Sequence, residues 1–349
     1  MIFDPILDIF RGKAVTIPPM DGALRPNTAL DDANVAASLS EPDNLVVLNG
    51  ELIASSGNAI YRLGAGAEPS ALKTFAAPIS ALAVSADGEL AVALEPGRLL
   101  VGEKEIELPA DICCITVLVY GADGSLYLAN GSIDTSPALW SQDLMAKGSS
   151  GSIWVLERGA SSFRRIAGGL AYANGLLVDG KDLIVSESWR HRLLRIDIKS
   201  GGMMPVAGNL PGYPGRLSRT ENGALLSIFA PMNRLIEFVL QETQYRKTMM
   251  RDIPVESWIA PSLSSGRSFL EPLQCGGIKT MGIHKPWSPS RSYGLVVQLD
   301  AAMQPVSSLH SRANGSRHGI TSAVVFDGSI YAASRGGDAI LVVPEGEFH

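Results

Sequence analysis

The sequence contains few cysteines. Cys113, Cys114 and Cys275 are the three in 349 residues. This number is too small for a disulfide framework, and the adjacent pair would be bridged only with strain. We therefore predict reduced thiols and a cytoplasmic protein.

Long apolar runs and blocks of charge are also missing. No stretch reaches the roughly 18 apolar residues of a membrane span, so no membrane partner is predicted. The first residues, MIFDPILDIFRGK, carry Asp4 and Asp8 inside an apolar stretch and have no positive start, so we expect no signal peptide. Charged residues make up only 18% of the chain, and the net charge of -6 is spread without a basic block, which argues against a nucleic-acid partner.

Signatures of familiar catalytic sites are absent too. The sequence has no phosphate loop and no HExxH, and the GSSGS of residues 148–152 lacks the spacing of a hydrolase elbow. Function has to be approached through the fold.

Glycine and proline, in contrast, are abundant. The 36 glycines, 21 prolines and 46% hydrophobic residues suit a folded, β-rich chain with many tight turns. Asp179-Gly180 lies between the apolar runs 176–178 and 183–185. Such a pair is a strong hairpin signal because glycine accepts the positive φ that the turn requires. Residues 172–197 are therefore predicted to form one antiparallel meander.

The same turn recurs along the chain. Asx-Gly pairs between apolar runs occur at Asn49-Gly50, Asp87-Gly88, Asp123-Gly124, Asp179-Gly180, Asn222-Gly223 and Asp327-Gly328. A spacing of roughly forty residues, with two wider gaps, is typical of propeller blades. The alternative is another all-β fold that such turns merely punctuate. We predict an all-β, six-bladed β-propeller with these turns on one face and Asn174 on the other.

The evenly spread turns leave no linker, so residues 1–349 are predicted to form a single domain. Residues 1–40 would form an N-terminal arm, in which Lys13 to Ile17 completes the last blade by pairing with its final strand. Helical inserts near 131–151 and 231–290 would cover the channel mouth. They contain Trp140, Trp258 and Trp287, and such large apolar groups are rarely placed on loops unless they pack on something.

Several blocks of sequence resemble a known superfamily. They are WSQDLMAKGSSGSIWVLE, YANGLLVDGKDLIVSES, NLPGYPGRLSRTENGALLSI, and SYGLVVQLD followed by GITSAVVFDGSIYAAS. In order and spacing they resemble the strictosidine synthase-like branch of the calcium-dependent phosphotriesterase superfamily, which also contains gluconolactonases, regucalcin and paraoxonases. The resemblance implies a six-bladed propeller with its site in the central channel. It covers residues 130–343 well and the first two blades loosely.

The resemblance also implies a calcium-type ion in the metal-dependent relatives, held by several oxygen ligands at the innermost strands. Asn174 matches one such ligand. The relatives' Asp after proline in blade five is replaced by Gly215-Arg216, and residues 114–116 offer no Asn or Asp. Because a guanidinium in the channel repels a cation, we predict no metal and no other cofactor.

The branch is named for a Pictet-Spenglerase, whose Glu near the start of the sixth inner strand corresponds here to Thr321. Without a carboxylate there, the proton transfer has no obvious base, so strictosidine synthesis is not predicted. Three alternatives stay open: a calcium-dependent hydrolase, a Pictet-Spenglerase-like lyase and a non-catalytic ligand-binding propeller.

The repeat predicts which side chains meet at the channel mouth, because segments before inner strands and loops after second strands share one face. Those expected there are Asp43, Asn58, Glu95, Asn130, Asn174, Glu187, Ser188, Arg216, Arg335 and His318. We predict substrate contacts by Asn174, Arg216, Glu187, Ser188, Arg335 and Trp140. Guanidinium groups favour an anionic or carbonyl-bearing small molecule. A structural ion pair of Arg216 with Glu187 or Asp43 is equally compatible with the sequence.

His318 is the predicted catalytic residue, because the pKa of histidine lies near neutrality and this one precedes the inner strand of blade six. Arg216 would stabilise the oxyanion while His318 activates water. His191 is expected in a solvated loop and His284 in lid packing. The predicted function is a lactone or ester hydrolase acting on an anionic or carbonyl-bearing small molecule.

Overall fold

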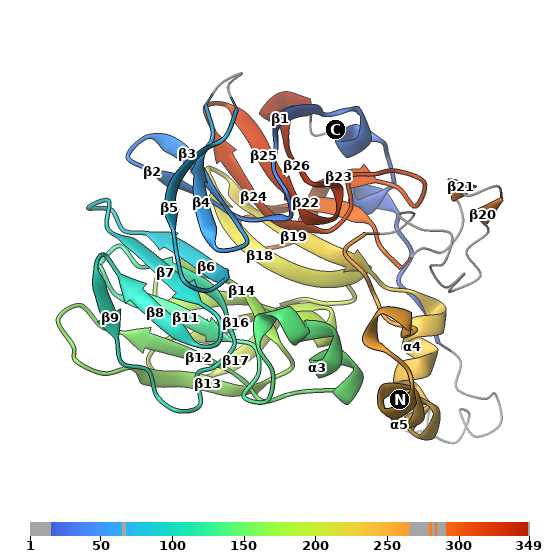
Figure 1. Cartoon of the computed structure of the whole chain (residues 1–349), viewed down its shortest axis with the longest axis horizontal. Coiled ribbons are helices and arrows are strands. Elements are labelled where there is room, and N and C mark those ends of the chain that lie inside the picture. Colours follow the sequence, from blue (N-terminus) through green and yellow to red (C-terminus); the bar gives the residue numbers. More distant parts are fainter. Residues whose placement is uncertain (1–14, 65–67, 265–278, 281–282, 285–290, 348–349) are drawn as a thin grey trace.

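The computed structural model describes residues 15–64, 68–264, 279–280, 283–284 and 291–347, and these form a six-bladed β-propeller (Figure 1). Each blade is an antiparallel four-stranded sheet. The predicted fold is confirmed. No helix in the described ranges is long and apolar enough to cross a membrane.

Blades one to three follow the chain in order. Their strands are β2 (Pro42–Leu48), β3 (Glu51–Ser56), β4 (Ala59–Arg62) and β5 (Ser70–Thr74); β6 (Ile79–Val84), β7 (Leu90–Leu94), β8 (Arg98–Val101) and β9 (Lys104–Ile106); and β10 (Ile115–Tyr120), β11 (Leu126–Asn130), β12 (Gly151–Leu156) and β13 (Arg164–Leu170). The first strand of each blade lies next to the central channel.

Blades four to six continue the pattern. Their strands are β14 (Ala173–Asp179), β15 (Asp182–Glu187), β16 (Arg192–Asp197) and β17 (Met203–Ala207); β18 (Gly212–Thr220), β19 (Gly223–Pro231), β22 (Gly294–Asp300) and β23 (Pro305–Ser311); and β24 (Ile320–Phe326), β25 (Ser329–Ser334), β26 (Ala339–Pro344) and β1 (Asn34–Ser38). A two-stranded sheet, β20 (Lys279–Thr280) with β21 (Ile283–His284), belongs to the second insert.

All six Asx-Gly pairs join the first strand of a blade to its second. They therefore lie at one end of the propeller, and the connections between blades lie at the other. At Asn49-Gly50 and Asp327-Gly328 both residues have positive φ, which matches the right-handed twist of the flanking strands. The local turn chemistry thus explains why the repeat was visible in the sequence.

The ring is closed by β1, which pairs with β26 (Figure 1). The prediction that Lys13 to Ile17 closes it is wrong: Val15 to Ile17 belong to no strand, and Lys13 lies outside the described residues. The reason is the anchoring of the arm by helix α2 (Ala29–Asp32), whose Leu30 is buried in the apolar core that blades five and six share. The chain that follows Leu30 is therefore the one delivered to the edge of β26.

The two inserts meet over one side of the channel mouth (Figure 1). Their helices are α3 (Trp140–Ala146), α4 (Arg234–Gln241) and α5 (Thr243–Asp252), so the helices predicted in the inserts near 131–151 and 231–290 are present. Met145, Ile236 and Trp258 are buried in one apolar cluster together with Tyr213 and Phe229 from blade five. Trp287 lies outside the described residues.

Short helices occupy several loops. They are the 3-10 turns Gly22–Leu24, Pro137–Leu139, Ser188–Arg190, Val255–Ser257, Arg335–Gly337 and Glu345–Glu347. Two of them, at Ser188 and Arg335, follow the second strands of blades four and six and bring polar residues to the mouth end of the propeller.

Candidate functional site

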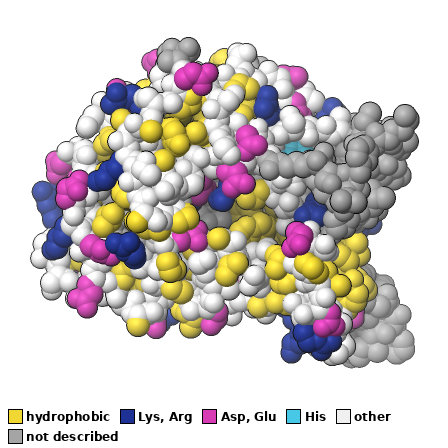
Figure 2. All heavy atoms as spheres, in the orientation of Figure 1, with side chains coloured by type: hydrophobic (Ala, Val, Ile, Leu, Met, Phe, Trp, Pro, Cys, Tyr) yellow, Lys and Arg dark blue, Asp and Glu magenta, His cyan; other side chains and the backbone are white. Residues whose placement is uncertain are grey.

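A pocket opens where the inserts meet the channel, on the face opposite the Asx-Gly turns. It has a volume of about 100 Å³, which is room for several water-sized groups. Its lining includes Glu41, Asp43, Ser80, Glu95, Thr116, Trp140, Tyr172, Asn174, Arg216, Phe229, Leu263, Thr321 and Arg335. Figure 2 shows charged side chains of both signs, beside apolar ones, around a hollow near the middle of the face that carries α3.

Arg216 forms the floor of the pocket, because it lines both this cavity and the channel below it. A break in the pairing of β18 with β19 between Pro214 and Leu217 places its side chain across the channel. Its Nη1 donates to Asp43 Oδ1 at 2.6 Å and to the Thr321 carbonyl at 3.2 Å. Its Nη2 donates to the Ser80 carbonyl at 2.8 Å and to Asp43 Oδ2 at 3.3 Å.

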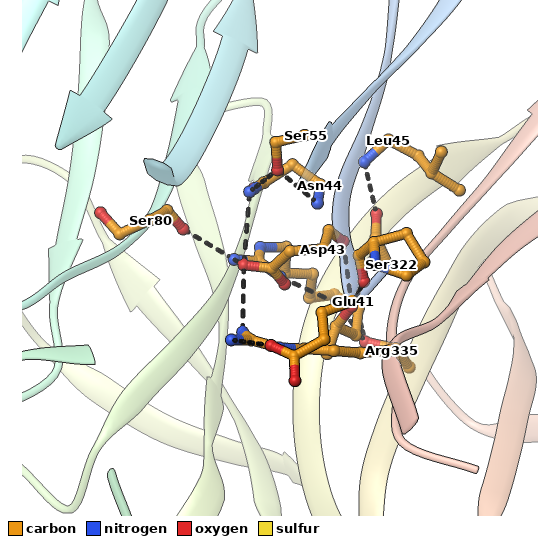
Figure 3. A network of polar contacts seen from close by, with 12 residues as sticks. Glu41, Asp43, Asn44, Leu45, Ser55, Ser80, Ser322 and Arg335 are labelled. Carbon is orange, nitrogen blue, oxygen red and sulfur yellow. Dashed lines mark hydrogen bonds and ion pairs between the residues drawn. The ribbon is translucent and has the colours of Figure 1, made fainter. Parts of the chain in front are cut away.

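Asp43 is the anionic partner in this arrangement. Figure 3 shows its carboxylate in the middle of a polar network that includes Glu41, Ser80 and Arg335. Burial alone would raise the pKa of Asp43, but the guanidinium groups of Arg216 and Arg335 outweigh burial and hold that pKa below its ordinary value. The structural ion pair that the sequence left open for Arg216 is therefore formed with Asp43, and not with Glu187.

Arg335 lies at the rim and is held more loosely. Its guanidinium is 3.6 Å from Glu41 Oε2 and 3.7 Å from Asp43 Oδ2, and its side chain is 36% exposed. At these separations the contacts are ion pairs without good hydrogen-bond geometry. Arg335 therefore keeps donors that a ligand in the pocket can use.

Asn174 and Glu95 complete the polar lining. A register shift between Ala173 and Gly175 places Asn174 at the mouth end of β14, and Gly175 lets blade four approach blade five, since a Cβ there would lie 2.1 Å from the Gly215 carbonyl oxygen. Within the described part of the chain, neither the Asn174 amide nor the Glu95 carboxylate has a hydrogen-bond or ion-pair partner, and both are half-buried. An amide donor and a free carboxylate thus line one cavity.

Glu187 and Ser188, predicted as substrate contacts, are not in the pocket lining. Glu187 is fully buried and accepts hydrogen bonds from Arg190, Arg192 and the backbone of Ala171. The Ser188 hydroxyl donates to the Pro214 carbonyl at 2.6 Å. Both side chains thus bind backbone groups of segments at or before the inner strands. Their role is to fix the backbone around the pocket.

His318, predicted as the catalytic residue, also lies outside the pocket lining. It is buried; its Nδ1 is 2.8 Å from Ser292 Oγ and its Nε2 is 2.8 Å from the Arg312 carbonyl. Gly319, with φ of +65°, turns the chain directly after it, and the imidazole stacks with Tyr293. The structure gives His318 no access to a ligand in the pocket, in contrast to Asn174, Arg216, Arg335 and Trp140, which it does bring together.

A second buried histidine gives a testable pH dependence. Burial lowers the pKa of His310 to about 4, below the ordinary 6.5, and it lowers the pKa of His191 in the same direction. Between pH 6.5 and 4 the unfolded chain therefore binds protons that the folded chain does not. The free energy of unfolding is therefore not reduced by these histidines above pH 6.5, and it falls as the pH drops below that value.

We expect the melting temperature of the wild type to fall as pH drops through this window and the His310→Gln variant to fall less steeply. One buried histidine contributes up to about 1.4 kcal/mol per pH unit. Thermal melts of both proteins between pH 7 and 4 measure the two slopes. Parallel slopes would contradict the role of His310.

Comparisons with known proteins add one finding. Neither models of known protein families nor curated proteins match the sequence. Solved structures match the fold: a gluconolactonase from Xanthomonas campestris has 13% identity and a TM-score of 0.55, with 91% of each chain covered. A provisionally assigned gluconolactonase has 11% identity and a TM-score of 0.54 over 89% of this chain and 91% of that one. The structural neighbours are thus gluconolactonase propellers, and at these identities the likeness establishes the fold.

The oxygens at the channel centre do not fit a divalent cation while Arg216 is in place. The Asp43 carboxylate and the carbonyls of Ser80 and Thr321 already accept from its guanidinium. A second cation at those oxygens would face this charge at contact distance. No step below is assigned to a metal.

Proposed function

We propose that the pocket hydrolyses a small, neutral lactone or ester that bears hydroxyl groups. The observation that carries the proposal is that Asn174 and Glu95 line one partly enclosed cavity, with no hydrogen-bond or ion-pair partner for the amide or the carboxylate among the described residues. An amide N–H can stabilise charge on a carbonyl oxygen, and a free carboxylate can accept a proton from water. The gluconolactonase neighbours support a lactone as the substrate.

The charges of the lining favour a neutral substrate over an anionic one. The pocket contains three carboxylates, of Glu41, Asp43 and Glu95, and two guanidinium groups, of Arg216 and Arg335. Two positive charges minus three negative charges leave a formal charge of minus one. Arg216 is moreover neutralised by Asp43. Of the two substrate types predicted from the sequence, anionic or carbonyl-bearing, we therefore retain the carbonyl-bearing one.

The reaction requires three roles. Glu95 takes a proton from water as the water oxygen attacks the carbonyl carbon, and Asn174 donates to the oxygen that becomes negative. The bond between the carbonyl carbon and the ring or ester oxygen then breaks, and the leaving oxygen receives the proton from Glu95. Arg335 and Glu41 at the rim would bind substrate hydroxyls, and Trp140 would cover an apolar face.

The fold implied by the resemblance to the strictosidine synthase-like branch agrees with this proposal. The residue at the branch's catalytic position does not support the branch's own reaction. The Thr321 hydroxyl, at the place of the branch's Glu, lies 3.0 Å from the backbone carbonyl of Asp43, to which it donates. A hydroxyl used in this way supplies no base for a Pictet-Spengler condensation. Hydrolysis is the function that the residues present support best.

A panel of neutral lactones and esters, assayed by proton release, tests the proposal. Asn174→Ala is expected to lower kcat/KM by about 10²- to 10³-fold, as for loss of one oxyanion donor. Asn58→Ala is the matched control, because Asn58 is an exposed asparagine that bonds the Phe75 carbonyl and is not in the lining. Binding without turnover would favour a ligand-binding propeller, and equal effects of both variants would remove Asn174 from the mechanism.

A further inference from the structure

The centre of the channel is built as a receptor for a cation. Oxygens from three different blades converge there: the Asp43 carboxylate from β2, the Ser80 carbonyl from β6 and the Thr321 carbonyl from β24. All three residues are buried. Oxygen atoms that converge from separate elements onto one buried point, with a carboxylate among them, favour a positively charged group there.

The guanidinium of Arg216 fills this receptor. It is supplied by blade five, so one planar group is bonded to blades one, two and six at once. Only arginine among the side chains has a rigid fork of donors that can reach three acceptors in different directions. The charge of Asp43 is thereby neutralised inside the protein.

We propose that the Arg216 guanidinium is a tethered cation in a genuine cation-binding site, and that truncation of this side chain converts the channel centre into a site for free cations, guanidinium above all. The proposal concerns the channel centre and stands whether or not the pocket above it hydrolyses a lactone. It follows from the acceptors, which belong to three other blades and stay in place when Arg216 is shortened.

Arg216→Ala would remove the guanidinium from the Asp43 carboxylate and from the Ser80 and Thr321 carbonyls, and would leave a cavity of guanidinium shape beside them. The neutral donors that remain, Ser227 Oγ at 3.2 Å from the Thr321 carbonyl and Asn44 Nδ2 at 3.5 Å from Asp43 Oδ2, do not replace the lost positive charge. The other polar residues of the pocket do not fill the gap: Arg335 contacts Asp43 only at 3.7 Å, and Asn174 lies on β14. A free guanidinium ion can restore the same hydrogen bonds, whereas a sodium ion lacks donors. The variant should therefore be stabilised by guanidinium selectively.

The test compares melting temperatures of purified full-length variants in low concentrations of guanidinium chloride and of sodium chloride. At a guanidinium concentration near ten times its Kd, the melting temperature of Arg216→Ala is expected to rise by about 2 °C. The wild type, whose receptor is filled, should show no rise. Arg219→Ala is the matched control, because Arg219 is on the same strand and bonds Val178 and Asp179, but is half-exposed outside the receptor.

Folding of Arg216→Ala only when guanidinium is present would count as the same result. A rise no larger than that in sodium chloride, or an equal rise in Arg219→Ala, would overturn the proposal. Calcium calorimetry on the wild type gives a test that does not depend on the variant's folding. No binding is expected there, and calcium binding that Asp43→Asn abolishes would show that the receptor is not filled by Arg216.

Discussion

Asp43→Ala is expected to destabilise the protein by about 3–5 kcal/mol. The change leaves the Arg216 guanidinium buried at the channel centre with two carbonyl acceptors and no counter-charge. Arg335, the other cation beside Asp43, would then repel Arg216 without screening by the carboxylate. Urea unfolding at neutral pH, with the m-value checked for two-state behaviour, measures the loss.

Two further proteins make the result interpretable. Glu105→Ala removes an ion pair of similar geometry, 2.8 Å from Arg98, but about half exposed, and should cost less than about 1 kcal/mol. The double variant Asp43→Ala, Arg216→Met removes both charges and should be more stable than Asp43→Ala alone. If Asp43→Ala costs no more than Glu105→Ala, the central ion pair is not what holds blades one and five together.

Glu95→Gln is expected to lower kcat by about 10²- to 10⁴-fold, with little change in KM, on whichever lactone or ester the panel identifies. The amide keeps the size and hydrogen-bonding capacity of the side chain but accepts no proton from water. Steady-state kinetics on the purified variant, with its melting temperature as a check on folding, gives both constants.

Glu41→Gln is the comparison for that experiment. Glu41 lines the same pocket, yet it is exposed and paired with Arg335, so its loss should act on KM and leave kcat nearly unchanged. A Glu95→Gln enzyme with wild-type kcat would assign proton transfer to another group, and equal effects at the two positions would point to charge alone.

The blades were predictable because their signal is local. Asx-Gly pairs are common in the tight turns of hairpins, and five of the six glycines have positive φ here, so each pair marks the hairpin around it. The ring closure was not predictable in this way. The β1 sequence, NVAAS, has no turn of its own and little apolar alternation, and its partner β26 is at the other end of the chain.

The site was predictable in its location and only partly in its roles. Asn174, Arg216, Arg335 and Trp140 were assigned to the channel mouth, and they line one pocket. The partner of Arg216 is 173 residues away in sequence, so the sequence could not choose between Asp43 and Glu187. That choice is made by Arg190 and Arg192, which already occupy Glu187.

His318 and Glu95 show opposite errors. The position of His318 before an inner strand suggested access to the channel. The positive φ of Gly319 turns the chain directly after it, and the imidazole of His318 is buried. Glu95 directly follows the second strand of its blade, and Glu187 is the last residue of the second strand in blade four. Nothing in the sequence separates a carboxylate left without a partner from one that neighbouring cations neutralise. Only the geometry of surrounding donors makes that distinction.

The pairing of β1 with β26 has a consequence for biosynthesis. Ser38 leaves the ribosome roughly 300 residues before its partner Ala339, which at about 5–20 residues per second is a wait of roughly 15–60 s. During this time β1 and the growing sheets present open edges, and the small, polar residues of β1 make that edge a poor template for other chains. A nascent chain that stops before residue 339 never closes, so truncated products, and not the finished ring, are the species that chaperones would have to hold.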